Sequence, residues 1–597
     1  MYILGVSCFY HDSAAALLKD GVLIAAAEEE RFSRVKHDNG FPRLAIQFCL
    51  RQAGITADDL DYVVFYEKPL VKFERILMTA LGTFPRSWRT FGEAMIAWFD
   101  EKLWIKSLLI SEIGVPAEKL LFTDHHLAHA ASAFFCSPYE EAAILTVDGV
   151  GEWTTTTMGY GKASWSDGGL NRIALLREQR FPHSIGLLYS AFTAFLGFKV
   201  NNGEYKVMGM APYGEPRFVE RMYDEIVKVQ ADGSFWLNMD YFSYHYSPER
   251  SFSDKLVKLF GEPRRPDSDF YTTLTDPDTA RPDDPMVKKN QRYADVAASI
   301  QRVTEELLLG LANRLHEETG LSRLCIAGGV GLNSVANGRI LRETGFEELF
   351  IQPAAGDSGG ALGAALYAYH VWLRQPRRFV LEHAYWGQEY GDDEVRAFLD
   401  GNGVSYEHVP DDERLLERVV DDLLAGKVVG FFQGRFEWGP RALGNRSILA
   451  DPRRLEMKDI VNSKIKFREP YRPFAPVVLE ERCGEYFELD EPERHHPARY
   501  MLMVCPVRRD KWAVIPAVTH QGGTGRVQTI QRERNPRYYR VLERFGQATG
   551  VPVLLNTSFN LRGEPIVSSP ADAYRTFRRS GLDTLVLGNC LIRKPDR

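Results

Sequence analysis

The chain carries the stretch His125-His126-Leu127-Ala128-His129, and nineteen residues later the apolar run from 142 to 147 ends at Asp148. His125 and His129 stand four residues apart, so on a helix both rings share one face and can reach a single cation. The alanines around them favour a helix, and the apolar run predicts a strand. We therefore expect a helix and a strand end to meet at one point. The alternative is that these histidines only pack against or cap a helix.

A further ligand for such a cation has to come from elsewhere in the chain. Our candidate is Asp357, because it opens the small-residue loop Gly356-Asp357-Ser358-Gly359-Gly360 after the strand-like run from 349 to 352. Two imidazoles and two carboxylates suit a borderline divalent ion such as iron, manganese or zinc. The sequence therefore predicts a metal site made by His125, His129, Asp148 and Asp357.

The length and composition of the chain limit the classes of protein to which it can belong. A chain of 597 residues exceeds what one hydrophobic core usually organises. Its 45% hydrophobic and 26% charged residues are ordinary for a globular protein. The start lacks the features of a signal peptide, and no stretch stays apolar for the ~18 residues of a membrane span, so we expect a cytoplasmic protein without a membrane partner. Seven cysteines without a CxxC pair argue against disulfides and structural zinc.

Two domains are expected, one over residues 1–378 and one over 381–597. The first opens with apolar runs at 2–6 and 14–18, a polar loop that contains His11, and the turn Asp20-Gly21, which predicts a β-hairpin with an interrupted first strand. The same order of strand, small polar loop and return strand recurs at 144–157, with Gly149 in the loop. We interpret this as a weak internal repeat, of the kind in which two halves close on the phosphates of a nucleotide.

A glycine loop, Gly328-Gly329-Val330-Gly331-Leu332-Asn333-Ser334, follows a strand-like run and opens a further helix. Its N–H groups can cradle phosphate at a helix N-terminus, although a tight strand-to-helix turn explains the same residues. Before it, a helix is expected from about Tyr293 to Glu318, preceded by a long loop over 262–286.

The charge balance points to a local anion site in the second domain. The net charge of −7 disfavours a nucleic-acid partner. Residues 434–472 nevertheless hold ten Lys and Arg against five Asp and Glu, and 520–540 hold five Arg, including Arg526, against one Glu. We expect Lys464, Lys466 and Arg468 to share one strand face, and these residues, with Arg441 and Arg446, to bind phosphate. Asn556 and Ser558 can contact a nucleotide or a carbonyl. A solvated basic face is the alternative.

Nearly end to end, the chain resembles the bacterial O-carbamoyltransferases of the nodulation-factor and antibiotic-tailoring type. The resemblance rests on the motifs His11-Asp12-Ser13-Ala14-Ala15, His125 to Ala130, Asp148-Gly149, the segments at Phe181 and Glu204, Gly328 to Asn333, Gly356 to Gly359, Gly439 to Ser447, Arg468 to Pro476 and Leu554 to Asn560. One position departs from the pattern: the family's acidic residue before Gly-Thr in the His-x-Asp-Gly-Thr segment is Gly522 here.

The resemblance implies an α/β protein with an N-terminal duplicated domain of the actin/hexokinase-like (ASKHA) ATPase class and a C-terminal YrdC-like domain, as in threonylcarbamoyl-adenylate synthases. It implies an iron-type ion, ATP with Mg²⁺, and carbamoyl phosphate, which is activated to carbamoyl adenylate before transfer to a hydroxyl of a small-molecule acceptor. Lys464 and Arg468 would serve adenylation. His11 is our candidate general base, with a structural role as the alternative. A homodimer is possible in this interpretation.

Three other functions fit parts of the pattern. A threonylcarbamoyl-tRNA-modifying enzyme shares both domain types, but the acidic net charge weighs against it. The hydrogenase-maturation carbamoyltransferases have CxxC zinc modules and the reverse domain order. An ATP-binding regulatory module of the same fold would show no turnover.

Overall fold

The computed structural model describes residues 1–100 and 102–594. They form two compact units, each described here by itself: unit 1 comprises residues 1–11, 15–23 and 55–380, and unit 2 comprises 12–14, 24–54 and 381–594. Residues 24–54 belong to unit 2, where Arg31 donates to the Gly439 carbonyl and Arg34 to the Ile566 carbonyl.

Two five-stranded sheets have the same strand order, and their strands belong to unit 1 apart from Ala14 of β2 and residues 24–28 of β3. The first has the order β3-β2-β1-β4-β5 and the second β8-β7-β6-β11-β12. In each, the central strand pairs in parallel with the next one, β1 with β4 and β6 with β11. The internal repeat expected from the sequence is thereby confirmed. The strands are β1 (Tyr2–Ser7), β2 (Ala14–Lys19), β3 (Val22–Glu28), β4 (Tyr62–Phe65), β5 (Leu120–Phe122), β6 (Glu141–Val147), β7 (Thr154–Lys162), β8 (Arg172–Arg180), β11 (Arg323–Ala327) and β12 (Glu348–Phe350).

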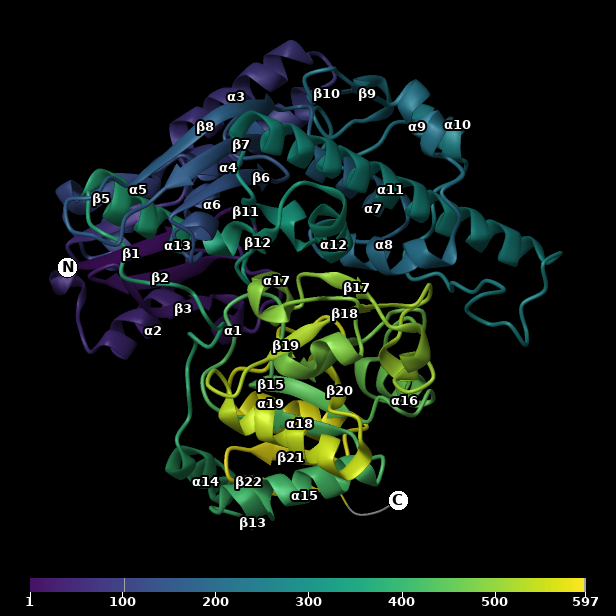
Figure 1. The fold of residues 1–597 in the computed structure, drawn as a ribbon. Coiled ribbons are helices and arrows are strands. Elements are labelled where there is room, and N and C mark those ends of the chain that lie inside the picture. Colours follow the sequence, from purple (N-terminus) through teal and green to yellow (C-terminus); the bar gives the residue numbers. More distant parts are fainter. Residues whose placement is uncertain (101, 595–597) are drawn as a thin grey trace. The chain divides into compact units, whose positions relative to one another are not determined.

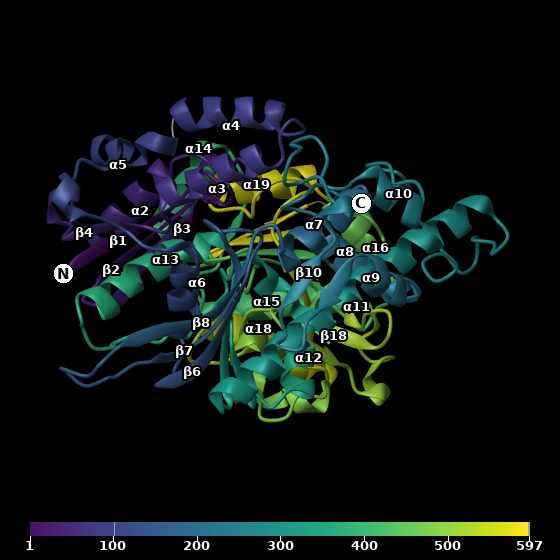
Figure 2. The same cartoon turned by 90° about the horizontal axis from the view of Figure 1, so that it is seen from above.

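Two helices lie between these sheets (Figure 2): α13 (Asp357–Tyr367) packs on β1, and α6 (His125–Phe134) packs on β6 and β11. The helices approach closely because their contact residues are small. A Cβ atom built on Gly363 of α13 would lie 1.8 Å from the Ala128 carbonyl oxygen of α6, and one on Gly5 would lie 1.8 Å from the Ala361 carbonyl oxygen. Glycine at these positions therefore sets the spacing between the layers.

We predict that Gly363→Ala destabilises unit 1 by roughly 1–3 kcal/mol, because the added methyl group has to push α13 away from α6. Chemical denaturation measures the effect. The matched control is Gly310→Ala in α11 (Pro285–Thr319), where a Cβ atom meets nothing within 4 Å; there we expect a gain of about 0.5–1 kcal/mol from helix propensity. Equal effects at the two positions would contradict the packing argument.

The long helix α11 begins earlier than expected, at Pro285 instead of near Tyr293. The Asp284 side chain caps it by accepting from the Met286 N–H, and proline suits the first helical turn. Residues 261–284 form neither helix nor strand, so the predicted long loop is confirmed. The other elements of unit 1 are α3 (Pro69–Gly82), α4 (Trp88–Asp100), α5 (Ile105–Ile113), α7 (Ile185–Phe195), α8 (Glu204–Met210), α9 (Val219–Glu225), β9 (Val227–Val229), β10 (Phe235–Leu237), α10 (Asp254–Phe260) and α12 (Ser334–Glu343).

Unit 2 is built on a mixed eight-stranded sheet of order β13-β22-β21-β14-β15-β20-β16-β19 (Figure 1). Its core joins the sheet to α15 and α18 through Leu415, Val419, Tyr538 and Leu542. The elements are α1 (Glu30–Ser33), α2 (Arg43–Ala53), α14 (Asp392–Gly401), β13 (Glu407–His408), α15 (Asp412–Leu424), β14 (Val429–Phe432), β15 (Arg446–Ala450), α16 (Met457–Ile460), β16 (Ala475–Leu479), α17 (His496–Arg499), β17 (Val504–Pro506), β18 (Thr524–Arg526), β19 (Gln528–Ile530), α18 (Pro536–Thr549), β20 (Val553–Ser558), α19 (Pro570–Arg579), β21 (Thr584–Leu587) and β22 (Cys590–Arg593).

Two further expectations concern disulfide bonds and membrane-spanning helices. All seven cysteines are buried free thiols, as expected. Within the described ranges, every helix is too short or too polar to cross a bilayer.

Candidate functional site

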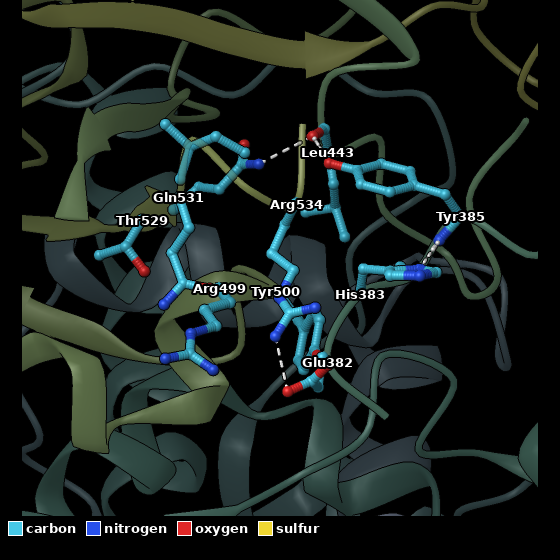
Figure 3. Close-up of a pocket in the computed structure, with 12 residues that line it drawn as sticks. Glu382, His383, Tyr385, Leu443, Arg499, Tyr500, Thr529, Gln531 and Arg534 are labelled. Atoms are coloured by element: carbon cyan, nitrogen blue, oxygen red, sulfur yellow. Dashed lines mark hydrogen bonds and ion pairs between the residues drawn. The ribbon is translucent and has the colours of Figure 1, made fainter. Parts of the chain in front are cut away.

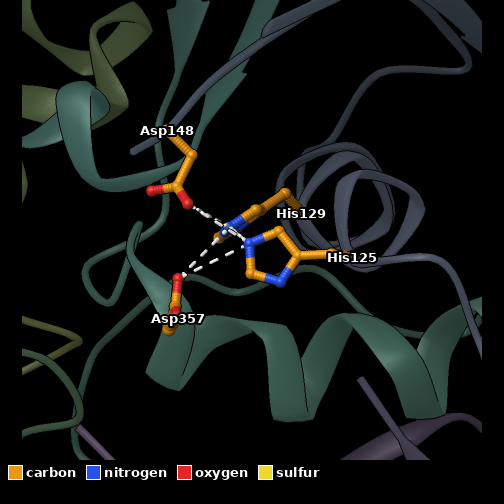
Figure 4. A group of neighbouring side chains, drawn as sticks. All are labelled: His125, His129, Asp148 and Asp357. Carbon is orange, nitrogen blue, oxygen red and sulfur yellow. Dashed lines mark hydrogen bonds and ion pairs between the residues drawn. The ribbon is translucent and has the colours of Figure 1, made fainter. Parts of the chain in front are cut away.

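The four predicted metal ligands meet in unit 1 (Figure 4). Nε2 of His125 lies 3.0 Å from Nε2 of His129 and 3.2 Å from Oδ2 of Asp148. Oδ1 of Asp357 lies 3.7 Å from Nε2 of His125 and 3.5 Å from Nε2 of His129. An ion about 2.1 Å from each donor atom holds neighbouring donors about 3.0–3.4 Å apart. The shorter separations match those required for one shared ion, whereas Nε2 of His129 and Oδ2 of Asp148 stand wider apart, at 4.0 Å.

The donor chemistry also fits a cation. Asp357 is 1% exposed, and both of its carboxylate oxygens are buried without a hydrogen bond from any described residue. A buried carboxylate is costly unless a positive charge compensates it. Burial lowers the pKa of His125, but the carboxylates of Asp357 and Asp148 outweigh it and raise that pKa to about 9. Protons and metal ions would therefore compete for this site.

The middle histidine of the motif has a structural role. Nδ1 of His126 lies 2.7 Å from Oγ1 of Thr146, and its Nε2 lies 2.9 Å from the Thr154 carbonyl oxygen. Burial and the two neighbouring imidazoles hold the pKa of His126 well below its usual value, so this ring is neutral. The helical spacing explains the difference, because His126 points to β6 and β7 while His125 and His129 share another face of α6.

Side chains that the sequence did not single out surround the donors. Glu152 accepts from the His125 N–H at 3.1 Å and from the Lys68 N–H at 2.8 Å, which fixes the start of α6. Glu67, paired with Lys72 at 2.6 Å, lies 4.0 Å from Nδ1 of His125. Such outer carboxylates orient a ligand ring. Glu152 stands in the loop after Asp148 and could have been suspected from that position, whereas Glu67 carries no comparable signal.

Tyr10 is a second residue that the motifs did not reveal. Its hydroxyl lies 3.5 Å from the position of a Cβ atom on Gly149, and the charges of Asp148 and Asp357 add to burial in raising its pKa above its ordinary range. The ring of His11, the predicted general base, lies 5.0 Å from the Tyr10 ring, centroid to centroid. The polar loop between β1 and β2 thus places Tyr10 near the two carboxylates, and the role of His11 stays a prediction.

The glycine loop does not present the free phosphate cradle that we expected. The Gly328 N–H donates to the Ala355 carbonyl, the Gly329 N–H to Oδ1 of Asp148 at 2.9 Å, and the Gly331 N–H to the Gly328 carbonyl. The Asn333 side chain caps α12 by accepting from the Ala336 N–H. These N–H groups are already used, so the loop turns the chain tightly and holds Asp148 in place.

The predicted strand face with Lys464, Lys466 and Arg468 is wrong. Residues Val461–Lys466 form a turn of π-helix, and Phe467 takes a left-handed backbone conformation. Lys464 is consequently exposed while Lys466 is buried. Arg468 donates from Nε to Oδ1 of Asn462 at 2.7 Å. Alternation of charged and apolar residues indicated a strand, but in this helical turn burial runs in pairs, and the consecutive residues Ile465 and Lys466 are both buried.

Lys466 and Arg526 nevertheless form a positively charged site in unit 2. The Lys466 ammonium contacts only neutral oxygens, those of Ser558 and Asn560 at 2.6–3.2 Å, and it pairs with no carboxylate in the described part of the chain. Burial, then Arg468, Arg472 and Lys36, hold its pKa well below the usual value. The Arg526 side chain has no hydrogen bond or ion pair to any residue of the described ranges. Burial, then Arg441 and Arg472, lower the pKa of Arg526.

The other residues predicted to contact phosphate or a nucleotide fall into two groups, those whose donors the fold already uses and those that stay candidates. Arg446 is committed to the fold, because its NH1 group donates to the carbonyls of Gln433 and Asn445 and its guanidinium lies 3.6 Å over the Phe432 ring. Asn556 donates to the Ala442 carbonyl and to Gln528, while its buried Oδ1 has no partner among the described residues. Arg441 remains next to Arg526, and Ser558 next to Lys466. Arg446 is therefore removed from the anion site, and the others stay candidates.

A pocket in unit 2 is lined by residues of β19 and the segment after it, by residues 382–385, and by Leu443, Arg499 and Tyr500 (Figure 3). Two arginines face it, but both have carboxylate partners: Arg499 pairs with Glu480 at 3.0 Å, and Arg534 with Glu382 at 2.6 Å. Its charges are thus internally balanced, so the region of Lys466 and Arg526 is the better anion site.

Two family models and several known proteins are similar to this chain. Residues 2–366 match the family model of the carbamoyltransferase N-terminus, and residues 420–594 match that of the carbamoyltransferase C-terminus. The uncharacterized protein sll1178 of Synechocystis sp. is 48% identical over 99% of this chain and 97% of its own length. The nodulation protein NolNO of Sinorhizobium fredii is 38% identical over 98% of this chain and 79% of its own.

A relative named as an O-carbamoyltransferase is also similar. The 3'-hydroxymethylcephem-O-carbamoyltransferase of Streptomyces clavuligerus is 35% identical over 45% of this chain and 49% of its own length. Both family models and the relatives that span the whole chain point to one family. The chain belongs to the carbamoyltransferase family.

Proposed function

We propose that the protein is an O-carbamoyltransferase that uses ATP to convert carbamoyl phosphate into carbamoyl adenylate and then transfers the carbamoyl group to a hydroxyl of a small molecule. The observation that carries the proposal is Arg526, whose guanidinium has no partner in the described chain although it lies beside Arg441 and Arg472. Arg472 pairs with Glu469 at 3.7 Å, whereas Arg526 pairs with no carboxylate of the described ranges. A guanidinium that stands unpaired beside other cations is unfavourable unless an anion compensates it. Phosphate is the anion that the family's chemistry supplies.

In this proposal, unit 2 performs adenylation. Carbamoyl phosphate, ATP and water give carbamoyl adenylate, phosphate and pyrophosphate; carbamate is the intermediate, and one of its oxygen atoms attacks the α-phosphorus. Lys466, Arg526 and Arg441 would neutralise the phosphoryl oxygens, which is the main contribution that a protein makes to phosphoryl transfer. The Oδ1 atom of Asn556, which has no partner among the described residues, would accept from the carbamoyl NH₂ group. Mg²⁺ would accompany the ATP phosphates.

Unit 1 performs the transfer. His125, His129, Asp148 and Asp357 would hold an iron-type or other borderline divalent ion, whose Lewis acidity polarises a carbonyl or phosphoryl oxygen when the ion is bound. His11 would take the proton of the acceptor hydroxyl, and Tyr10, with its raised pKa, stays protonated and can donate a hydrogen bond. The hydroxyl oxygen bonds to the carbamoyl carbon, and AMP leaves.

The acceptor is proposed to be an alcohol of a sugar or a natural product. Its class follows from the relatives, one of which is named for carbamoylation of a hydroxymethylcephem. Incubation with ATP, carbamoyl phosphate and a panel of alcohols tests this function, with pyrophosphate release and the mass of one added carbamoyl group as readouts. Release of neither pyrophosphate nor AMP with any alcohol would refute it.

A further inference from the structure

Two residues of unit 2 form a strained pair that the proposed mechanism does not use. Asp12 and His37 both have left-handed backbones, with φ angles of 52° and 56°. Aspartate and histidine adopt this conformation at a cost, and such residues gather at functional sites. Nδ1 of His37 lies 2.7 Å from Oδ1 of Asp12. The fold therefore holds the two side chains in contact although they stand 25 residues apart.

The contact leaves one nitrogen of the ring available. Because Asp12 accepts at Nδ1, the neutral ring carries its proton on Nδ1 and a lone pair on Nε2. Nε2 is buried and has no hydrogen-bond partner in the described chain. In a general base of this kind, a carboxylate fixes the tautomer of the imidazole and the opposite nitrogen has no hydrogen-bond partner.

A metal site is a second interpretation, because Glu30 lies near the pair and the three side chains have donor atoms within 4.8 Å of one another. Lys36 argues against it. Its ammonium lies 3.0 Å and 3.2 Å from the two carboxylate oxygens of Glu30, and the His37 N–H donates to the same carboxylate at 2.9 Å. The positive charge that a cation would bring is already present, and Glu30 instead anchors the backbone of His37.

The segment that carries His37 contacts the loop of the proposed phosphate site: Arg34 donates to the Pro565 and Ile566 carbonyls, and Asn560 of that loop accepts from Lys466. Lys36, the neighbour of His37 in the chain, is near enough to Lys466 for its charge to contribute to the lowered pKa of that lysine. Asp12, Lys36, His37 and Lys466 all belong to unit 2. A base next to a phosphate-binding ammonium is suited to activate a nucleophile for attack on a bound phosphoryl group.

We propose that His37, oriented by Asp12, is the base that activates water to cleave carbamoyl phosphate before adenylation. This inference rests on the proposed function and names the residue for its first step. The water oxygen bonds to phosphorus, the bond from phosphorus to the carbamoyl oxygen breaks, carbamate leaves, and the water proton goes to Nε2 of His37. Asp12 is a positioning residue for this step.

The test is His37→Asn, because the asparagine amide reproduces the Nδ1 donor to Asp12 and lacks Nε2. Pyrophosphate release from ATP is measured with carbamoyl phosphate, and separately with ammonia plus bicarbonate, which form carbamate in solution. We expect release from carbamoyl phosphate to fall about 10²–10⁴-fold, while release from carbamate stays within about threefold of the unaltered protein. Asp12→Asn should show the same contrast with a smaller loss.

The matched control is His408→Asn, which alters another histidine of unit 2 that contacts an aspartate, Asp392, at 3.0 Å. It should leave both activities unchanged. The assignment of His37 would be overturned if His37→Asn lost pyrophosphate release equally with carbamoyl phosphate and with ammonia plus bicarbonate, or lost it with neither. An unaltered protein that releases pyrophosphate with neither source would overturn the proposed function itself.

Discussion

Arg526→Met is expected to stabilise the protein while it abolishes adenylation. The change removes a charge that has no partner in the described chain and that lies next to Arg441 and Arg472, so the folded state loses like-charge repulsion and desolvation cost. The same change removes a group that compensates phosphoryl charge, which in comparable sites costs about 10²–10³-fold in rate. Denaturant unfolding and pyrophosphate release measure the two effects on one preparation.

The two effects have opposite signs, which makes the experiment decisive. A residue with only a structural role would lose stability and activity together. Arg532→Met is the control from the same basic segment, because Arg532 pairs with Glu543 at the surface and should change neither quantity by much. Full adenylation activity in Arg526→Met would remove this residue from the anion site.

His129→Ala is expected to abolish retention of the divalent ion and carbamoyl transfer while it spares adenylate formation. Nε2 of His129 is one of four donor atoms that converge, and a three-donor site binds borderline ions much more weakly. We expect transfer to fall more than about a thousandfold, since the ion's Lewis acidity is lost. Elemental analysis of the purified variant and release of pyrophosphate separate the two halves of the prediction.

His316→Ala is the control for that experiment. His316 lies in the last turn of α11, where its Nδ1 is 2.8 Å from the Leu321 carbonyl oxygen, outside the donor cluster. It should keep both the ion and the transfer activity. Unchanged metal content in His129→Ala would refute the ligand assignment.

Much of the candidate metal site in unit 1 could be predicted because most of its donor residues lie close together in the sequence. The spacing of His125 and His129 predicted a shared helix face, and the apolar run before Asp148 predicted a strand end; both elements are present. Asp357 was expected in a small-residue loop, but residues 357–360 form the first turn of α13 and still bring its carboxylate to the other donors. The close packing at Gly363 could not be foreseen, since it depends on a carbonyl of another helix.

The basic segment of unit 2 shows why other expectations failed. Lys464 and Lys466 alternate with apolar residues as in a strand, yet tertiary packing imposes π-helical turns there. Arg446 looked like a phosphate ligand, but its donors satisfy backbone carbonyls of its own loop. Charge counts indicated only the segment of the proposed anion site, because the partner of each cation depends on contacts between distant residues.

The donor atoms of the metal centre come from α6, from the end of β6 and from the start of α13, which are separated by up to 232 residues of chain. An ion held by all three would act by mass action on folding, adding about 2.7 kcal/mol to the stability of the native state at a hundredfold excess over its dissociation constant. Treatment with a chelator should then loosen the layers between the sheets as well as stop turnover. The melting temperature of this protein would then depend on how much of the ion remains bound after purification.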